Sequence, residues 1–286
     1  MIVTRFAPSP TGYLHLGHAY AAIFAHDRAR ENGGRFLLRL EDIDLTRVRP
    51  EFADAIVEDI RWLKLEFEVP VLSQSTRFDA YRAALACLDS QDLLYPCFCT
   101  RSDIAREIAR AIEAPHGPNG PLYPGTCRAL TAHERESKMN ADSAYALRLD
   151  TQAAARRIGP ITFLEEGAGP NGERGHVPVD PLLFGDVVLA RKDIPASYHL
   201  AVVVDDAFQG VSLVTRGNDL FAAAHIQRVL QALLGYDAPA YAHHALILDE
   251  NGRKFSKRDR SVTLKVLREA GETPADVRAR LGFTSR

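Results

Sequence analysis

The chain lacks the features that mark several large classes of protein. It has only four cysteines in 286 residues, and three of them are clustered, which fits a metal site in a reducing compartment better than a disulfide framework. No apolar run is long enough to span a bilayer, and no basic N-terminal region precedes a long apolar stretch. These absences predict a cytoplasmic protein with no membrane partner.

A strong excess of positive charge is also absent. The 35 Lys and Arg residues against 37 Asp and Glu residues give a net charge of -2, so any contact with RNA must come from local basic patches. One candidate patch is Arg101, Arg106 and Arg110 on a predicted helix, although a solvated helix face would have the same composition. A second consists of Arg253, Lys254, Lys257, Arg258 and Arg260.

The chain begins with an alternation of strand and helix patterns. Strands are predicted at residues 2–6 and 36–40, and helices at 18–32 and 50–63. Such a βαβα start indicates an α/β fold with a parallel sheet. The hydrophobic content of 46% is enough for a sizeable core, arranged as one large domain with an insertion or as two domains.

The middle of the chain interrupts this rhythm with Gly- and Pro-rich loops at residues 114–125 and 167–175. Buried-looking strands follow at 200–204 and 211–215, then a helix at 219–234, a strand at 245–248 and short helices at 264–270 and 274–281. We therefore expect a discontinuous domain from residues 1–92 and 196–245, an insertion at 93–195, and a C-terminal segment at 246–286.

One string of residues has the pattern of a phosphate site. Arg5-Phe-Ala-Pro-Ser-Pro-Thr-Gly-Tyr-Leu-His-Leu-Gly-His18 reads as the end of a strand, a Pro/Gly turn and the start of a helix. A helix N-terminus offers unpaired N–H groups and partial positive charge to phosphate. His15 and His18 share one helical face and can donate to phosphate oxygens, and Gly17 lets a nucleotide lie flat. Each histidine alone would also fit an ordinary helix start.

These residues resemble a known family. Pro8-Ser-Pro-Thr-Gly-Tyr-Leu-His-Leu-Gly-His18 is similar to the HIGH signature of class I aminoacyl-tRNA synthetases, and the form Arg5-Phe-Ala-Pro-Ser-Pro-Thr-Gly12 resembles the glutamyl branch. Lys254-Phe-Ser-Lys-Arg258 corresponds to the mobile KMSKS loop, with Phe255 in place of Met and Arg258 in place of the last Ser. The further matches are Leu38-Arg-Leu-Glu-Asp-Ile-Asp44, Gln74-Ser-Thr-Arg-Phe-Asp-Ala-Tyr81, Tyr198-His-Leu-Ala-Val-Val-Val-Asp-Asp206 and Val214-Thr-Arg-Gly-Asn-Asp219.

The resemblance implies a Rossmann-like catalytic domain, an inserted zinc-binding subdomain, and glutamate and ATP as substrates, the ATP with Mg²⁺. It implies catalytic roles for His15, His18 and Lys257. The residues implied for ATP binding are His15, Gly17, His18, Lys254, Ser256 and Lys257. Those implied for glutamate are Arg5, Phe6, Ala7, Pro8, Ser9, Glu41, Tyr198 and Arg216. Arginine suits a side-chain carboxylate because its planar fork binds two oxygens. Without the family, Glu41, Asp42 and Asp44 could also be a divalent-metal cluster.

The clustered cysteines Cys97, Cys99 and Cys127 form a candidate zinc site that needs a fourth ligand. The resemblance implies Tyr123, while His116 and His133 are alternatives on local chemistry. The cysteines could instead be small buried apolar side chains. Cys87 follows a helical pattern of small apolar residues, and we expect it in the core.

The chain ends at Arg286, shortly after the second signature, without the large helical anticodon-binding region of glutamyl-tRNA synthetases. In this it resembles the glutamyl-queuosine tRNA(Asp) synthetases. That family implies activation of L-glutamate without tRNA and transfer to queuosine at the wobble position of tRNA(Asp), by a protein expected to be a monomer. The alternatives are a shortened glutamyl-tRNA synthetase that charges the 3′ end of tRNA(Glu), and an inactive zinc-stabilised RNA-binding module.

Overall fold

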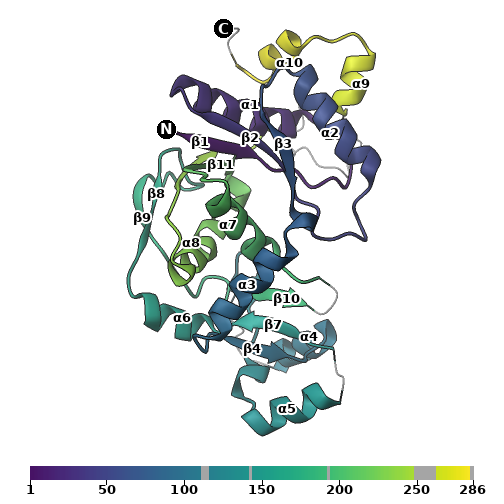
Figure 1. Ribbon diagram of the computed structural model, residues 1–286. Helices are drawn as coiled ribbons and strands as arrows, with labels where there is room; N and C mark the ends of the chain where they lie inside the picture. Colours follow the sequence, from purple (N-terminus) through teal and green to yellow (C-terminus); the bar gives the residue numbers. More distant parts are fainter. Residues whose placement is uncertain (111–115, 142–143, 192–193, 248–261, 284–286) are drawn as a thin grey trace.

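The computed structural model describes residues 1–110, 116–141, 144–191, 194–247 and 262–283. Lys254, Ser256 and Lys257, together with the basic patch around them, lie outside this part of the chain. Figure 1 shows an elongated molecule with the first strands and the C-terminal helices at one end and α4 and α5 at the other. Between the two ends, α3 runs alongside the central helices.

The first half of the sheet has the predicted βαβ start. Its parallel strands, in the order β1-β2-β3, are β1 (Val3–Phe6), β2 (Arg35–Leu40) and β3 (Glu68–Ser73). Two helices connect them, α1 (Leu16–Glu31) and α2 (Pro50–Trp62). Helix α1 packs closely through its alanines, since Ala19 and Ala22 are fully buried. Pro50 begins α2 at a position where a missing N–H costs nothing.

The second half comes from a distant part of the chain. It has the strand order β11-β12-β8-β9, in which β9 alone is antiparallel to its neighbour. The strands are β8 (Thr162–Glu165), β9 (Gly175–Pro178), β11 (Leu213–Gly217) and β12 (Ala240–His244). Helices α7 (Tyr198–Phe208) and α8 (Ala223–Leu234) accompany them. Ser212 joins the halves, because its N–H donates to the Val3 carbonyl (3.0 Å) and its Oγ accepts from the Val3 N–H (2.9 Å).

A separate antiparallel sheet lies in the middle segment, in the order β10-β7-β4, reached through α3 (Phe78–Asp89). Its strands are β4 (Leu94–Cys97), β7 (Ala146–Leu149) and β10 (Val188–Arg191), and a small ribbon nearby pairs β5 (His116–Gly117) with β6 (Gly120–Pro121). The helices of this segment are α4 (Arg101–Arg110), α5 (Ala132–Asn140) and α6 (Thr151–Ile158). Short 3₁₀ turns occur at η1 (Gln74–Thr76), η2 (Thr126–Ala129) and η3 (Asn218–Leu220).

The last two helices, α9 (Leu264–Glu269) and α10 (Pro274–Arg280), pack back onto the first half of the fold. Leu264 and Val277 are fully buried in the same apolar cluster as α1 and α2. Two ion pairs link them to the first half of the fold: Arg268 with Asp59 on α2, and Arg278 with Asp27 on α1. None of the helices in the described ranges is both long and apolar enough to cross a membrane.

Three sequence-based expectations are wrong. The predicted strand at 200–204 belongs to helix α7, which begins where the Ser197 side chain accepts the Leu200 N–H. The strand expected at 245–248 lies earlier, as β12 (Ala240–His244). Cys87 is exposed, because the buried face of α3 is formed by Tyr81, Ala84, Leu85 and Leu88, and position 87 points away from that face. The parallel α/β sheet itself is confirmed.

Candidate active site

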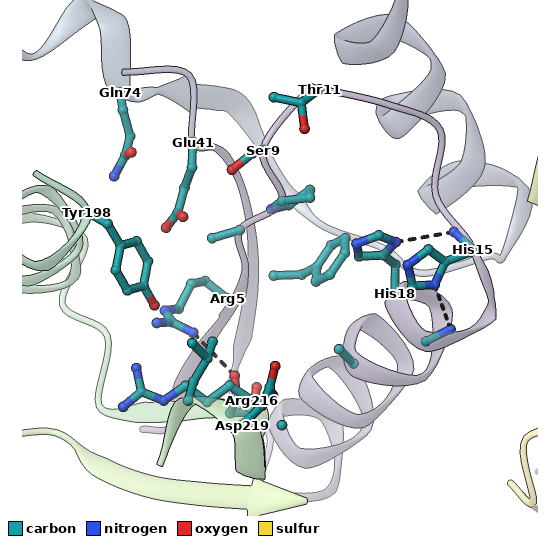
Figure 2. Close-up of a pocket in the computed structure, with 18 of the residues that line it drawn as sticks. Arg5, Ser9, Thr11, His15, His18, Glu41, Gln74, Tyr198, Arg216 and Asp219 are labelled. Atoms are coloured by element: carbon teal, nitrogen blue, oxygen red, sulfur yellow. Dashed lines mark hydrogen bonds between the residues drawn. The ribbon is translucent and has the colours of Figure 1, made fainter. Parts of the chain in front are cut away.

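A cavity of about 720 Å³ lies at the carboxyl ends of β1, β2 and β11, beside the start of α1, where parallel sheets place their ligands. All the predicted substrate residues within the described ranges line it: Arg5, Phe6, Ala7, Pro8, Ser9, His15, Gly17, His18, Glu41, Tyr198 and Arg216. Figure 2 shows Arg5, Glu41 and Tyr198 on one side and the two histidines on the other. The cavity thus has two chemically different ends.

The described residues on either side of 248–261 both lie at this cavity. Leu246 and Ile247 line it. On the far side, Thr263 pairs with His15 in an isolated β-bridge, and the Leu264 N–H donates to the Leu14 carbonyl at 2.8 Å. The described residues that flank the second signature in sequence therefore lie next to the first signature.

The two histidines are held by the backbone at the start of α1. His15 Nδ1 accepts the N–H of Gly17 at 3.1 Å, and His18 Nδ1 accepts the N–H of His15 at 3.2 Å. Their rings lie 3.8 Å apart between centroids. Because both Nδ1 atoms accept, the ring proton of each neutral histidine is on Nε2. Each ring is thereby prepared as a donor through Nε2.

Buried charges surround the other end of the cavity. Arg5 binds Asp206 through two nitrogens, at 2.9 and 3.2 Å, and fully buried Arg39 binds Asp206 at 2.8 Å and Glu41 at 3.5 Å. Burial alone would raise the pKa of Asp206, but the two arginines hold it below its usual value. For Glu41, burial dominates and raises the pKa despite Arg39 and Arg5. An arginine and a carboxylate thus face the cavity from one compensated network.

Arg216 enters the cavity from β11 and is itself 5% exposed. Its Nε donates to His243 Nε2 at 3.1 Å and its Nη1 to Gln227 Oε1 at 2.8 Å. Its Nη2 is buried and has no hydrogen-bond partner among the described residues. Since a buried N–H group without a partner is costly, this nitrogen is suited to a carboxylate that arrives with a ligand.

Several lining residues are not assigned a role in substrate binding from the sequence: Thr11, Asp44, Gln74, Thr215, Asp219 and His244. Gln74 is held in place by donating to Asp205 at 2.9 Å. A signal existed for most of them, because Thr11, Asp44, Gln74, Thr215 and Asp219 fall within segments that match the synthetase pattern. His244 lies outside these segments, and its place in the lining depends on where strand β12 lies in space.

The acidic residues after β2 do not form a metal cluster. Asp42 accepts two hydrogen bonds from Ser75, at 2.8 and 2.6 Å. Within the described ranges, the group with metal-ligand spacing is Cys97, Cys99 and Cys127 alone. The alternative of a divalent-metal site at Glu41, Asp42 and Asp44 therefore has no support in the structure.

The cysteine group lies where β4 meets η2. Its three sulfurs are within 4.8 Å of one another, and the Tyr123 hydroxyl is 3.4 Å from Cys97 Sγ and 3.5 Å from Cys99 Sγ. These spacings suit a tetrahedral ion with Zn–S bonds of about 2.3 Å. His116 and His133 are exposed and outside the group. The arrangement is that of a candidate zinc site.

Arg148 on β7 packs against this cluster. Its guanidinium lies 3.9 Å from the centre of the Tyr123 ring. Burial opposes ionisation of Cys97, but its interactions with Tyr123 and Arg148 lower the pKa of its thiol below the ordinary value. A thiolate is the form that binds metal.

Comparison with known proteins agrees with this geometry. Residues 1–285 match the family model described as tRNA synthetases class I (E and Q), catalytic domain. The chain therefore belongs to this family of class I aminoacyl-tRNA synthetases and is an enzyme of the ligase class.

Individual members of this family differ in how closely, and over how much of their length, they match this chain. The sequence is 47% identical to the Glutamyl-Q tRNA(Asp) synthetase of Rhodobacter capsulatus, over 99% of this chain and 100% of that one. It is 37% identical to the glutamate–tRNA ligase of Aquifex aeolicus, over 96% of this chain but 55% of that one. The crystal structure of the glutamate-tRNA synthetase of Elizabethkingia anophelis is similar with a TM-score of 0.75 at 28% identity, over 90% of this chain and 53% of that one.

Proposed function

We propose that this enzyme activates L-glutamate with ATP, without needing tRNA, and transfers it to queuosine at the wobble position of tRNA(Asp). The observation that carries the proposal is the meeting, in one cavity, of a phosphate-binding helix start and a buried arginine with an unpartnered Nη2. Full-length relatives named Glutamyl-Q tRNA(Asp) synthetase support the choice of acceptor.

In the first step, the α-carboxylate of glutamate attacks the α-phosphorus of ATP, and pyrophosphate leaves. Negative charge develops on the phosphate oxygens, so fixed donors are more useful than a nucleophilic side chain. His15 and His18 supply such donors through Nε2, with Gly17 at the close approach and Lys254, Ser256 and Lys257 arriving from the second signature. In the second step, a hydroxyl of queuosine attacks the activated carbonyl and AMP leaves.

The amino acid occupies the end with the buried charges. Glu41 takes the substrate ammonium, and Arg5 and Ser9 contact the rest of the amino acid. Tyr198 and Arg216 take the side-chain carboxylate, while Phe6, Ala7 and Pro8 form the wall behind it. A neutral amide in place of that carboxylate would leave the arginine unpaired in a buried site, which disfavours glutamine.

We assign a structural zinc to Cys97, Cys99, Tyr123 and Cys127, within the proposed inserted unit at residues 93–195, from which β8 and β9 join the sheet of β11 and β12. The ion would tie β4 to the turn η2 and would have no part in the reaction. Reduced thiols and a tRNA substrate favour a cytoplasmic location, and we propose a monomer.

The test is glutamate-dependent ATP–pyrophosphate exchange by the purified protein with no RNA, followed by glutamate transfer to tRNA(Asp) with and without queuosine. Exchange without RNA and labelling of only the queuosine-containing tRNA are expected. Exchange that occurs only when tRNA(Glu) is added would instead favour a shortened glutamyl-tRNA synthetase. The 35–37% identical glutamate–tRNA ligases support this alternative. Silence under all conditions would favour an inactive RNA-binding module.

A further inference from the structure

We infer that His243, fixed by Glu165, is a positioning residue that aims Arg216 at the side-chain carboxylate of the substrate and thereby sets the preference for glutamate. This inference rests on the proposed activation of glutamate. It adds two residues, from β12 and β8, that do not line the cavity themselves.

A continuous chain of hydrogen bonds connects the three side chains. Glu165 Oε2 lies 2.5 Å from His243 Nδ1, and His243 Nε2 lies 3.1 Å from Arg216 Nε. The side chains of Glu165 and His243 are both fully buried. Both ring nitrogens of His243 and both carboxylate oxygens of Glu165 have partners, and buried polar groups satisfied in this way are rigid.

The direction of each bond follows from the chemistry of the guanidinium. Arginine has only donors, so His243 Nε2 must accept and cannot hold a proton. The ring proton is therefore on Nδ1 and points to Glu165. Glu165 cannot turn away, because its Oε1 accepts the backbone N–H groups of His243 at 2.9 Å and Gly167 at 2.8 Å.

The surrounding contacts fix the plane of the His243 ring and the plane of the Arg216 guanidinium. The ring of Tyr241 is nearly parallel to that of His243, at 5°, and Phe221 packs edge-on with its centroid 5.0 Å away. With Nε held by His243 and Nη1 by Gln227, the guanidinium of Arg216 has a single orientation. Its Nη2, which lacks a partner among the described residues, is the direction left for a ligand.

The neutral imidazole also explains why Glu165 contacts Arg216 only through His243 and not directly. A carboxylate in direct contact with Arg216 would occupy its planar fork and compete with the substrate. Placed behind His243, Glu165 compensates the buried positive charge over a longer distance and leaves the fork for the ligand. The arrangement resembles the use of an outer carboxylate to orient a metal-ligating histidine.

The decisive variants alter the acceptor that faces Arg216. His243→Leu removes it and should raise the KM for glutamate by about 10- to 100-fold, the range typical of lost outer-shell partners, with the KM for ATP unchanged. His243→Gln can return an oxygen acceptor and should recover part of the loss. Glu165→Gln presents an amide N–H to Nδ1, which forces the proton to Nε2, against Arg216, and should act like His243→Leu.

Matched controls come from neighbouring surface residues. His176→Leu on β9 and Glu166→Gln beside β8 remove a histidine and a charge outside the network, and should leave both KM values at their wild-type levels. In each variant, the ratio of kcat/KM for glutamate to that for glutamine is measured as well. A merely structural role for His243 would lower the Tm or both substrates' parameters together, without a selective fall in this ratio.

A measurement on the unmodified enzyme keeps the inference testable if the variants do not fold. The ¹⁵N shifts of the His243 ring should show Nδ1 protonated and Nε2 unprotonated, with and without glutamate. Protonated Nε2, or a folded His243→Leu enzyme with wild-type KM and selectivity, would overturn the inference. Absence of exchange in the wild type would instead reject the proposed function, and the ring shifts would still report on the network.

Discussion

Single residues in the cavity depend on charges that are buried in compensated groups. Asp206 is the common partner of Arg5, which faces the cavity, and of fully buried Arg39, which in turn contacts Glu41. Two positive and two negative groups thus remain in a region almost closed to water. Removing one partner leaves another charge uncompensated, which is far more costly than losing a surface ion pair.

Asp206→Asn tests this dependence. Arg5 and Arg39 would lose their shared carboxylate, and we expect a loss of about 3–5 kcal/mol in the free energy of unfolding, measured by urea denaturation. The same change at the exposed Asp237 should alter the stability by less than about 0.5 kcal/mol. Equal stability of the two variants would contradict the compensated network.

Lys257→Ala tests the second signature. Loss of one preorganised donor to the phosphates should lower glutamate-dependent exchange by roughly 100- to 1000-fold, while the far-UV circular dichroism spectrum stays unchanged. Lys138→Ala, on the exposed face of α5, serves as a matched control that should retain activity. Near-normal exchange by the Lys257 variant would rule out its assigned role.

At the level of secondary structure, the sequence predicts helices and strands correctly where the spacing of apolar residues has a clear helical or strand period. The strand–turn–helix start was predictable because caps and a turn rich in Pro and Gly delimit it. Helix α7 was not, because its run Leu200–Val204 is buried on all sides, and an unbroken apolar run fits a buried strand equally well. The sequence pattern predicts strand β12 too late in the chain, because two histidines are unusual in a buried strand. His243 is nevertheless 2% exposed and bonded to Glu165.

The residues of the cavity also divide into those that the sequence predicts and those that only the folded structure reveals. The cavity-lining residues that the sequence predicts, such as Arg5, Glu41 and Arg216, all lie inside family-like segments, where residue type and spacing together reveal them. The partners that hold these residues, Glu165, His243 and Gln227, were not identified. They come from three elements that only the folded sheet brings together, and sequence spacing contains no record of such contacts.

The junction of α2 and α9 contains a carboxylate whose ionisation opposes folding. Burial raises the pKa of Asp59 to about 6, against an ordinary 3.8, although Arg268 lies 3.1 Å away. Between these two values the folded protein holds more protons than the unfolded chain, so stability falls as the pH rises from about 4 to 6.

Asp59→Asn should remove this cost. A shift of about two units corresponds to at most about 3 kcal/mol, so the variant should be more stable than the wild type at pH 7.5, with the difference shrinking toward pH 4.5. Thermal unfolding at several pH values measures it. A variant that is less stable at pH 7.5 would show that the ion pair with Arg268 outweighs the burial of charge.

At the scale of the whole molecule, the cysteine cluster lies beside β4, whereas the cavity lies beside β1, β2 and β11. Figure 1 shows β4 well separated from these three strands. Cys127→Ser should abolish bound zinc, measured by elemental analysis, and lower the Tm, by roughly 2–4 °C for each kcal/mol lost. Exchange without RNA should stay within a few-fold of the wild type. Cys87→Ser, outside the cluster, should keep its metal, and loss of zinc from that variant would refute the assigned ligands.

The joint at Ser212 has a consequence for the order in which the protein is made. Strand β1 is synthesised well before Ser212, so one of its two edges meets its partner only after residues 209 positions further on have been made. Until then this edge is an unpaired template for other strands. A newborn chain therefore needs protection of β1 until Ser212 has been made, and nascent chains cut short before Ser212 should be the species that chaperones capture and that aggregate.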